Sequence, residues 1–221
     1  QLETLERQKS WASQFPLQEM KSMNLLPDNR STAELVEPLL KFFGIASSEE
    51  WRRIYVDKEV SAAFRTSLAY TKNPQAVSAW LRIGEIEVGK MDLPAFDKKK
   101  FRNSLESIRV LTYEMPVCFK QVLQKICADA GVAIIYTPSL PNAHISGAYR
   151  WYLGVPVIQL SAHYEADDHF WSAFFHGAGH ILLHGKKDIF MKDLEGVEND
   201  LEKEKEANRF AAKWLNLQTR T

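Results

Sequence analysis

The sequence predicts an α+β protein, in which a helical N-terminal region precedes a domain with a small antiparallel or mixed sheet packed on a long buried helix. Three observations support this fold class. The first ninety or so residues show no alternation of apolar and polar residues, which half-buried strands require. Short β-branched and aromatic runs are found between residues 132 and 160. An uncharged stretch from Phe170 to Gly185 follows them and is typical of a core helix.

The helices expected in the N-terminal region are marked by ordinary start and stop signals. The capping sequence Ser47-Ser-Glu-Glu begins one of them, and Gly44 ends the helix before it. The expected helices are Leu5–Met20, Thr32–Phe43, Ser47–Val56 and Ala76–Val88. Residues 1–93 are therefore predicted to be a helical linker or scaffold region.

The pattern changes around Met91–Pro94, and residues 94–221 are predicted to form the second domain. Its turn signals are Gly131, Pro141-Asn142 and Gly154. Three strands that follow one another so closely are expected to form a small meander. The expected elements are helices Phe96–Leu111 and Pro116–Ala130, strands Val132–Tyr136, Ile145–Tyr152 and Val155–Leu160, and helices Asp167–His184 and Asp200–Leu215.

Charge and cysteine content limit the classes of function. Lys and Arg total 28 and Asp and Glu total 28, so the chain has no overall basic field that would hold nucleic acid or anionic lipid. No segment has the length and apolarity of a signal peptide or of a membrane span. Cys118 and Cys127 are expected to be free thiols in a reducing compartment. We therefore expect a cytoplasmic protein that does not contact a membrane.

The residues expected to carry chemistry begin with the sequence His-Gly-Ala-Gly-His at 176–180, which places two histidines one turn apart on one helical face. Two imidazoles at this spacing can bind one zinc ion, and a metal would offset the cost of burying them in an apolar helix. The third histidine of the metzincin pattern is missing, because Lys186 stands at its place. His184 lies one further turn along the same face; it is expected to support a ligand or to interact with the helix C-terminus, and the alternative is that it is itself a ligand.

A third zinc ligand has to come from the last helix, whose carboxylates include two candidates. Glu206 lies at the edge of the apolar stripe of this helix, and Glu204 also falls near that stripe. Helical periodicity does not choose between them. Solvated carboxylates paired with lysines are the alternative interpretation of the whole segment.

Two motifs in this region are specific, namely Phe170-Trp171 through His184, and Glu206-Ala207-Asn208 with Phe210-Ala211-Ala212. With them the chain resembles the ImmA/IrrE zinc metallopeptidase domain, especially the version fused behind a helix-turn-helix in HigA-like transcriptional regulators. The resemblance implies a zinc ion held by His176, His180 and Glu206, and thus favours Glu206 over Glu204. It also implies a helix-turn-helix before residue 1. The C-terminus is expected to be cut short, because Thr221 comes one turn after a helical pattern that is still in progress. Weaker matches are Ala79-Trp80-Leu81-Arg82, the stretch from Cys127 to Val132, Ser146-Gly147-Ala148 and Pro156–Ser161.

Position 177 departs from the family pattern. The family motif is His-Glu-x-Gly-His, and Gly177 stands where the glutamate is expected. That glutamate is the general base, which takes a proton from zinc-bound water and returns it to the leaving amine; glycine can do neither. Loss of a general base removes about 10²- to 10⁴-fold in rate, so we expect little or no peptidase activity. Gly179 is explained by close helix packing, but the sequence offers no packing reason for Gly177.

The third expected strand comes directly before the histidine helix. In zinc peptidases of this general layout an edge strand at that place pairs with an extended substrate. This interpretation makes Gln159 and Ser161 candidate substrate contacts. The alternative is an ordinary sheet edge that binds no ligand.

Three functions follow from these features. The first is a zinc-dependent metallopeptidase domain of a bacterial transcriptional regulator, which in its intact form would cleave a repressor or partner protein. The second is a pseudopeptidase that binds a peptide, a small ligand or a toxin partner and controls an attached DNA-binding domain. In both, DNA would be contacted only through a helix-turn-helix outside this chain. The third is a structural module, such as a homodimer, with histidines in its core and no metal.

Overall fold

The computed structural model describes residues 2–56, 73–114, 116–162, 168–186, 188–192 and 200–216. These residues fall into two compact units. The first comprises the chain up to Ile83 together with Ser139–His144, and the second comprises Gly84–Pro138 and the described residues from Ile145 onward. The division lies inside helix α6 (Pro74–Gly89), whereas the change in the sequence pattern comes after residue 90.

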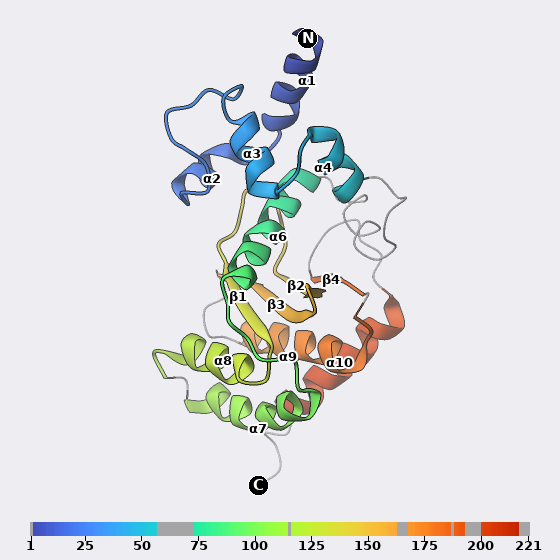
Figure 1. Cartoon of the computed structure of the whole chain (residues 1–221). Coiled ribbons are helices and arrows are strands. Elements are labelled where there is room, and N and C mark those ends of the chain that lie inside the picture. The colour runs from blue at the N-terminus through green and yellow to red at the C-terminus, as the bar shows by residue number, and fades with distance from the viewer. Residues whose placement is uncertain are drawn as a thin grey trace. The chain divides into compact units, whose positions relative to one another are not determined.

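The first unit contains α1 (Leu2–Ala12), α2 (Leu17–Ser22), α3 (Val36–Phe43), α4 (Ser48–Tyr55) and the first residues of α6 (Figure 1). The expected helix from Leu5 to Met20 is divided, because Pro16 lacks an amide hydrogen and cannot continue a helix. The signals around α4 are confirmed. Gly44 ends α3 with φ 69°, and the side chain of Ser47 accepts a hydrogen bond of 3.1 Å from the amide of Glu50.

The core of the first unit is a cluster of aromatic rings. Trp11 and Phe15 lie edge to face with 5.0 Å between ring centroids, and Phe15 contacts Trp51 in the same way at 5.5 Å. Phe43 and Tyr55 extend the cluster, with 5.5 Å between their centroids. These contacts hold α1, α3 and α4 together, as the helical apolar pattern predicts.

The sheet of the second unit has the order β1-β3-β2-β4 (Figure 1). Its strands are β1 (Ala133–Thr137), β2 (Gly147–Tyr152), β3 (Val155–Ser161) and β4 (Phe190–Lys192). Strand β1 pairs in parallel with β3, and β2 is antiparallel to both β3 and β4. The expected mixed sheet is confirmed, but the expected meander is wrong, because the connection from β1 to β2 is long enough to leave room for β3 between them. Strand β4 was not predicted, since so short a run gives no alternating pattern.

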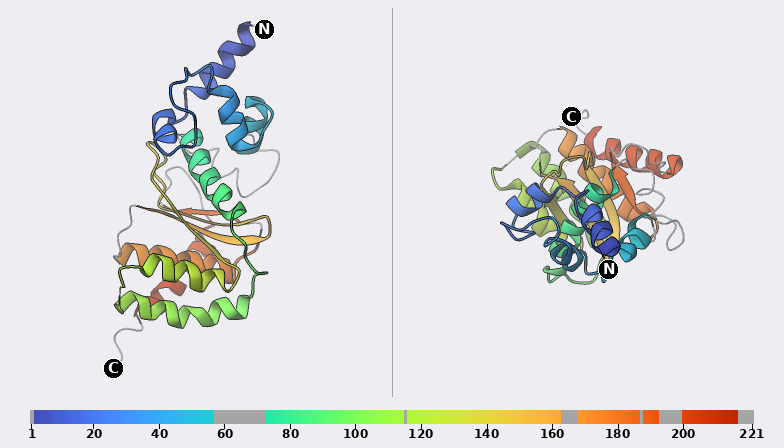
Figure 2. Two further views of the ribbon diagram at one scale, coloured as in Figure 1. Left: turned by 60° about the vertical axis from the view of Figure 1, so that its left-hand side comes forward. Right: turned by 90° about the horizontal axis from the view of Figure 1, so that it is seen from above.

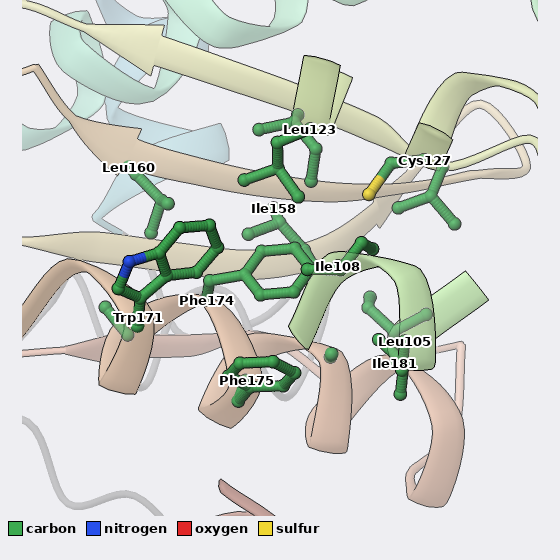
Figure 3. Close-up of a cluster of buried hydrophobic side chains, with 14 of the residues drawn as sticks. Leu105, Ile108, Leu123, Cys127, Ile158, Leu160, Trp171, Phe174, Phe175 and Ile181 are labelled. Atoms are coloured by element: carbon green, nitrogen blue, oxygen red, sulfur yellow. The ribbon is translucent and has the colours of Figure 1, made fainter. Parts of the chain in front are cut away.

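Helices α7 (Lys98–Glu114), α8 (Phe119–Ala128), α9 (Asp168–Leu183) and α10 (Leu201–Asn216) lie on one side of the sheet (Figure 2). Between sheet and helices lies the main core, in which side chains of α7, α8, β3 and α9 interdigitate (Figure 3). The other face of the sheet packs on Val88, at the end of α6, and on the segment that follows it. No helix in the described part of the chain is both long and apolar enough to cross a bilayer.

Candidate metal centre

Helix α9 is buried between the sheet and α10, as its apolar sequence predicts. Every residue from Ala173 to Leu182 is buried, and His176 and His180 are only 5% and 3% exposed. Helix α10 approaches closely at Gly179, where an added Cβ would lie 3.2 Å from the Cα of Ala207. The packing reason predicted for Gly179 is thereby confirmed, because a larger side chain would push the two helices apart.

Three side chains converge where α9 and α10 meet. The Nε2 atoms of His176 and His180 lie 2.9 Å apart. The carboxylate oxygens of Glu204 lie 3.2 Å from Nε2 of His176 and 3.4 Å from Nε2 of His180. All three potential ligand atoms lie within 4.8 Å of one another.

Hydrogen bonds behind the imidazoles fix which nitrogen of each ring carries the proton. Nδ1 of His176 donates to Oδ1 of Asn208 at 2.9 Å, so in the neutral ring Nε2 keeps a free electron pair. Nε2 of His184 donates to Glu206 at 3.1 Å, which leaves Nδ1 of His184 as an acceptor for Nδ1 of His180 at 2.8 Å. Nε2 of His180 is therefore also an electron-pair donor. A partner on the second nitrogen of each histidine is typical of protein metal sites.

The protonation states favour a cation at this point. Burial is the largest of the effects that lower the pKa of His180 to about 4, so the ring is neutral at physiological pH. Burial alone would raise the pKa of Glu204, but its interactions with His176 and His180 outweigh burial and lower this pKa to about 2. Glu204 is thus ionised. Two imidazole nitrogens and this carboxylate face one another, an arrangement that a zinc ion would neutralise.

The two glutamates of α10 differ in position. The resemblance implied Glu206 as the third ligand, whereas the structure places Glu204 against both histidines and Glu206 against His184. The reason is helical geometry: Glu204 precedes buried Ala207 by three residues, so it shares the face that packs on α9, while the side chain of Glu206 is 51% exposed. Glu204 is therefore the carboxylate that lies beside the two histidines, and Glu206 lies behind His184.

Gly177 lies on the side of α9 that faces β2. Contrary to the expectation from the sequence, this glycine has a packing reason, because the ring of Tyr149 covers it. A Cβ at position 177 would lie 2.3 Å from Cδ1 and Cε1 of Tyr149, so no side chain fits there without a rearrangement.

The candidate substrate residues lie inside the sheet. Strand β3 has a neighbour on each side, so the expectation that it forms an edge is wrong and an extended peptide cannot pair with it. Gln159 is fully buried, accepts a hydrogen bond from Arg150 at 2.9 Å and donates one to Thr137 at 2.8 Å. Ser161 is 6% exposed, and its amide donates to the carbonyl of Ser146. Sequence reasoning placed β3 at the edge because it expected a meander, whereas β3 lies between β1 and β2.

Sequence reasoning also assigned no role to three residues at this site. Asn208 binds His176, while Phe190 and Tyr149 lie against His180 with ring centroids 3.7 Å and 5.6 Å away. A signal for Asn208 was present, since Glu204 and Asn208 are four residues apart, the same spacing as the two histidines. The aromatic rings come from strands outside the helix and gave no such signal.

One comparison with known proteins gives a match, and it includes this site. Residues 127–221 match the family model of the M78 peptidases, described as the IrrE N-terminal-like domain. Neither curated proteins nor solved structures gave a match. The matched stretch contains α9, α10 and all the residues that converge between them. Residues 127–221 are therefore an ImmA/IrrE-type domain with a metallopeptidase-like fold.

Proposed function

We propose that this chain is a zinc-binding, metallopeptidase-like domain of a bacterial transcriptional regulator, and that it binds a partner without hydrolysing peptide bonds. The observation that carries the proposal is the convergence of His176, His180 and Glu204 beside a glycine at position 177. The proposed metal ligands are present, while the residue at the family's general-base position has no group that can accept a proton.

His176, His180 and Glu204 would hold the zinc ion, which would supply Lewis acidity at this site. Neighbouring residues would keep the ligands in place. Asn208 and His184 orient the two imidazoles, and Glu206 orients His184. Phe190 and Tyr149 line the site with apolar surface, which excludes water from the imidazoles.

Metal analysis of protein purified without a metal column tests the proposed ligands. We expect about one zinc per chain in the wild type and in Glu206→Ala, and none in Glu204→Ala. Glu202→Ala is a matched control, because Glu202 is exposed on the same helix and its side chain pairs with Lys205. Zinc lost from Glu206→Ala and kept by Glu204→Ala would restore the ligand set that the resemblance implies. No zinc in the wild type would favour the structural module.

The regulatory part of the proposal is supported by the resemblance to HigA-like regulators, in which a helix-turn-helix contacts the DNA. The partner would be a repressor or a toxin protein. The chain has equal numbers of basic and acidic residues, so we expect residues 1–221 alone not to bind DNA. Fluorescence anisotropy with duplex DNA tests this, with a helix-turn-helix protein and its own operator as the positive control. Sequence-specific binding by residues 1–221 alone would contradict the proposal.

A second measurement addresses hydrolysis. Incubation of the zinc-loaded chain with the candidate repressor or toxin, followed by mass spectrometry, is expected to show an intact partner. Metal-dependent cleavage, abolished by Glu204→Ala, would show instead that the chain is an active peptidase.

A further inference from the structure

The contact between α9 and β2 explains why position 177 is a glycine. The missing glutamate alone does not explain this. A Cβ at Gly177 would lie 2.3 Å from two ring carbons of Tyr149 and 3.2 Å from a third. Carbon atoms that are not bonded to each other are in contact at about 3.5–4.0 Å, so even the smallest side chain would overlap the ring. The glycine is therefore required by its neighbour.

The ring of Tyr149 cannot easily move away. It is 1% exposed, and its hydroxyl donates a hydrogen bond of 2.9 Å to the carbonyl of Ala173, one turn before Gly177. The ring centroid also lies 5.5 Å from that of His176 and 5.6 Å from that of His180, with the His180 plane within 20° of parallel. Strand β2 positions the residue, since Tyr149 pairs with Ile158 of β3 and with Phe190 of β4.

We propose that Tyr149 and Gly177 form one steric unit, in which the tyrosine ring occupies the volume that any side chain at position 177 would need. The inference rests on the proposed function in one respect, namely that this volume borders the metal site. The absence of an acid–base group at position 177 then depends on both residues, which belong to different elements of the fold. Gly177→Glu alone would force a carboxylate into the ring and would not complete a peptidase site.

This steric unit predicts that a glycine-to-alanine substitution in a helix lowers the Tm. Gly→Ala inside a helix ordinarily stabilises a protein, because alanine has the higher helix propensity. Here Gly177→Ala is expected to lower the Tm by about 5 °C, since overlap with the ring outweighs that gain. In a Tyr149→Val background, where the overlapping ring carbons are gone, Gly177→Ala should leave the Tm unchanged or raise it.

Two controls isolate the ring. Tyr149→Phe keeps the ring and removes only the hydroxyl that binds Ala173, so Gly177→Ala should remain destabilising in that background. Gly179→Ala places its Cβ against α10, near Ala207 and Phe210, and should shift the Tm equally in all three backgrounds.

The experiment is a thermal denaturation series on the full chain, in EDTA and with added zinc, with zinc content measured separately. Equal shifts for Gly177→Ala in the wild-type and Tyr149→Val backgrounds would overturn the inference. If Gly177→Ala does not fold, recovery by Tyr149→Val supports the inference, and failure to recover overturns it. Coupling without bound zinc would contradict the proposed function alone, whereas bound zinc without coupling would contradict this inference alone.

Discussion

Helix α9 meets two neighbours within one turn, and glycine serves a different purpose at each contact. Toward α10, Gly179 allows Ala207 to approach, and this close approach brings Glu204 and Asn208 to the histidines. Toward β2, Gly177 is covered by the ring of an aromatic residue. One contact gathers polar groups suited to a metal, and the other excludes a polar side chain from the place where acid–base chemistry would occur. The two contacts can therefore be probed with different variants.

The largest expected effect concerns the α9–α10 contact. Glu204→Ala removes the carboxylate that faces both imidazoles, and we expect zinc binding to fall below measurable stoichiometry. Isothermal titration with zinc and elemental analysis check this. Tyr149→Phe keeps the ring that lies beside both histidines and removes only the hydroxyl that binds Ala173, so it is expected to keep about one zinc per chain. Full zinc occupancy in Glu204→Ala would remove Glu204 from the site.

Removal of the metal should destabilise the same contact. A ligand present at about 1,000 times its Kd stabilises a protein by about 4 kcal/mol, so chelation is expected to lower the Tm by about 10 °C. Differential scanning calorimetry with and without EDTA measures the shift. Glu204→Ala should show no EDTA effect, and an undiminished effect in that variant would place the metal elsewhere.

A smaller effect on metal affinity is expected from Glu206, which supports a ligand through His184. Glu206→Ala leaves His184 without the acceptor that orients it, and loss of such a supporting group costs about 10- to 100-fold in metal affinity. Competition with a chromogenic chelator measures the change in Kd. Glu202→Ala should leave the Kd unchanged, and an equal effect of both variants would point to general electrostatics in place of a hydrogen-bonded chain.

The smallest effect concerns the glycines themselves. Gly179→Ala is expected to lower the free energy of unfolding by about 1 kcal/mol, because the backbone of Ala207 cannot retreat from the added methyl group. Gly89→Ala, at the end of α6, meets no atom within 4 Å and should instead raise it by up to about 1 kcal/mol. Chemical denaturation measures both. Stabilisation by Gly179→Ala would mean that the α9–α10 approach is looser than the structure indicates.

The local signals of the sequence predicted most of the helices well. Helix α9 was expected over 167–184 and runs from Asp168 to Leu183, and α10 was expected over 200–215 and runs from Leu201 to Asn216. Both carry their periodicity and end signals within the segment itself. The long expected helix at the N-terminus failed at Pro16, a local signal that was present and given too little weight.

Strand order was beyond the reach of these signals. A strand's alternation indicates which residues share a face, but not which strands are neighbours. The central position of β3, and with it the burial of Gln159, depends on how the connection from β1 to β2 runs, because β3 pairs with both of those strands. For that reason the candidate substrate contacts were placed at an edge that β3 does not form.

The sequence by itself determined the fold class, the helix that carries His176 and His180, and the absence of a proton-accepting side chain at position 177. These features depend on local patterns, each within a single segment, and within a helix the geometry fixes which side chains share a face. Only the tertiary structure decided that Glu204 and not Glu206 faces the histidines, and that Tyr149 covers Gly177. Both depend on how closely separate elements approach one another, and that distance is set by side-chain packing between residues far apart in the chain.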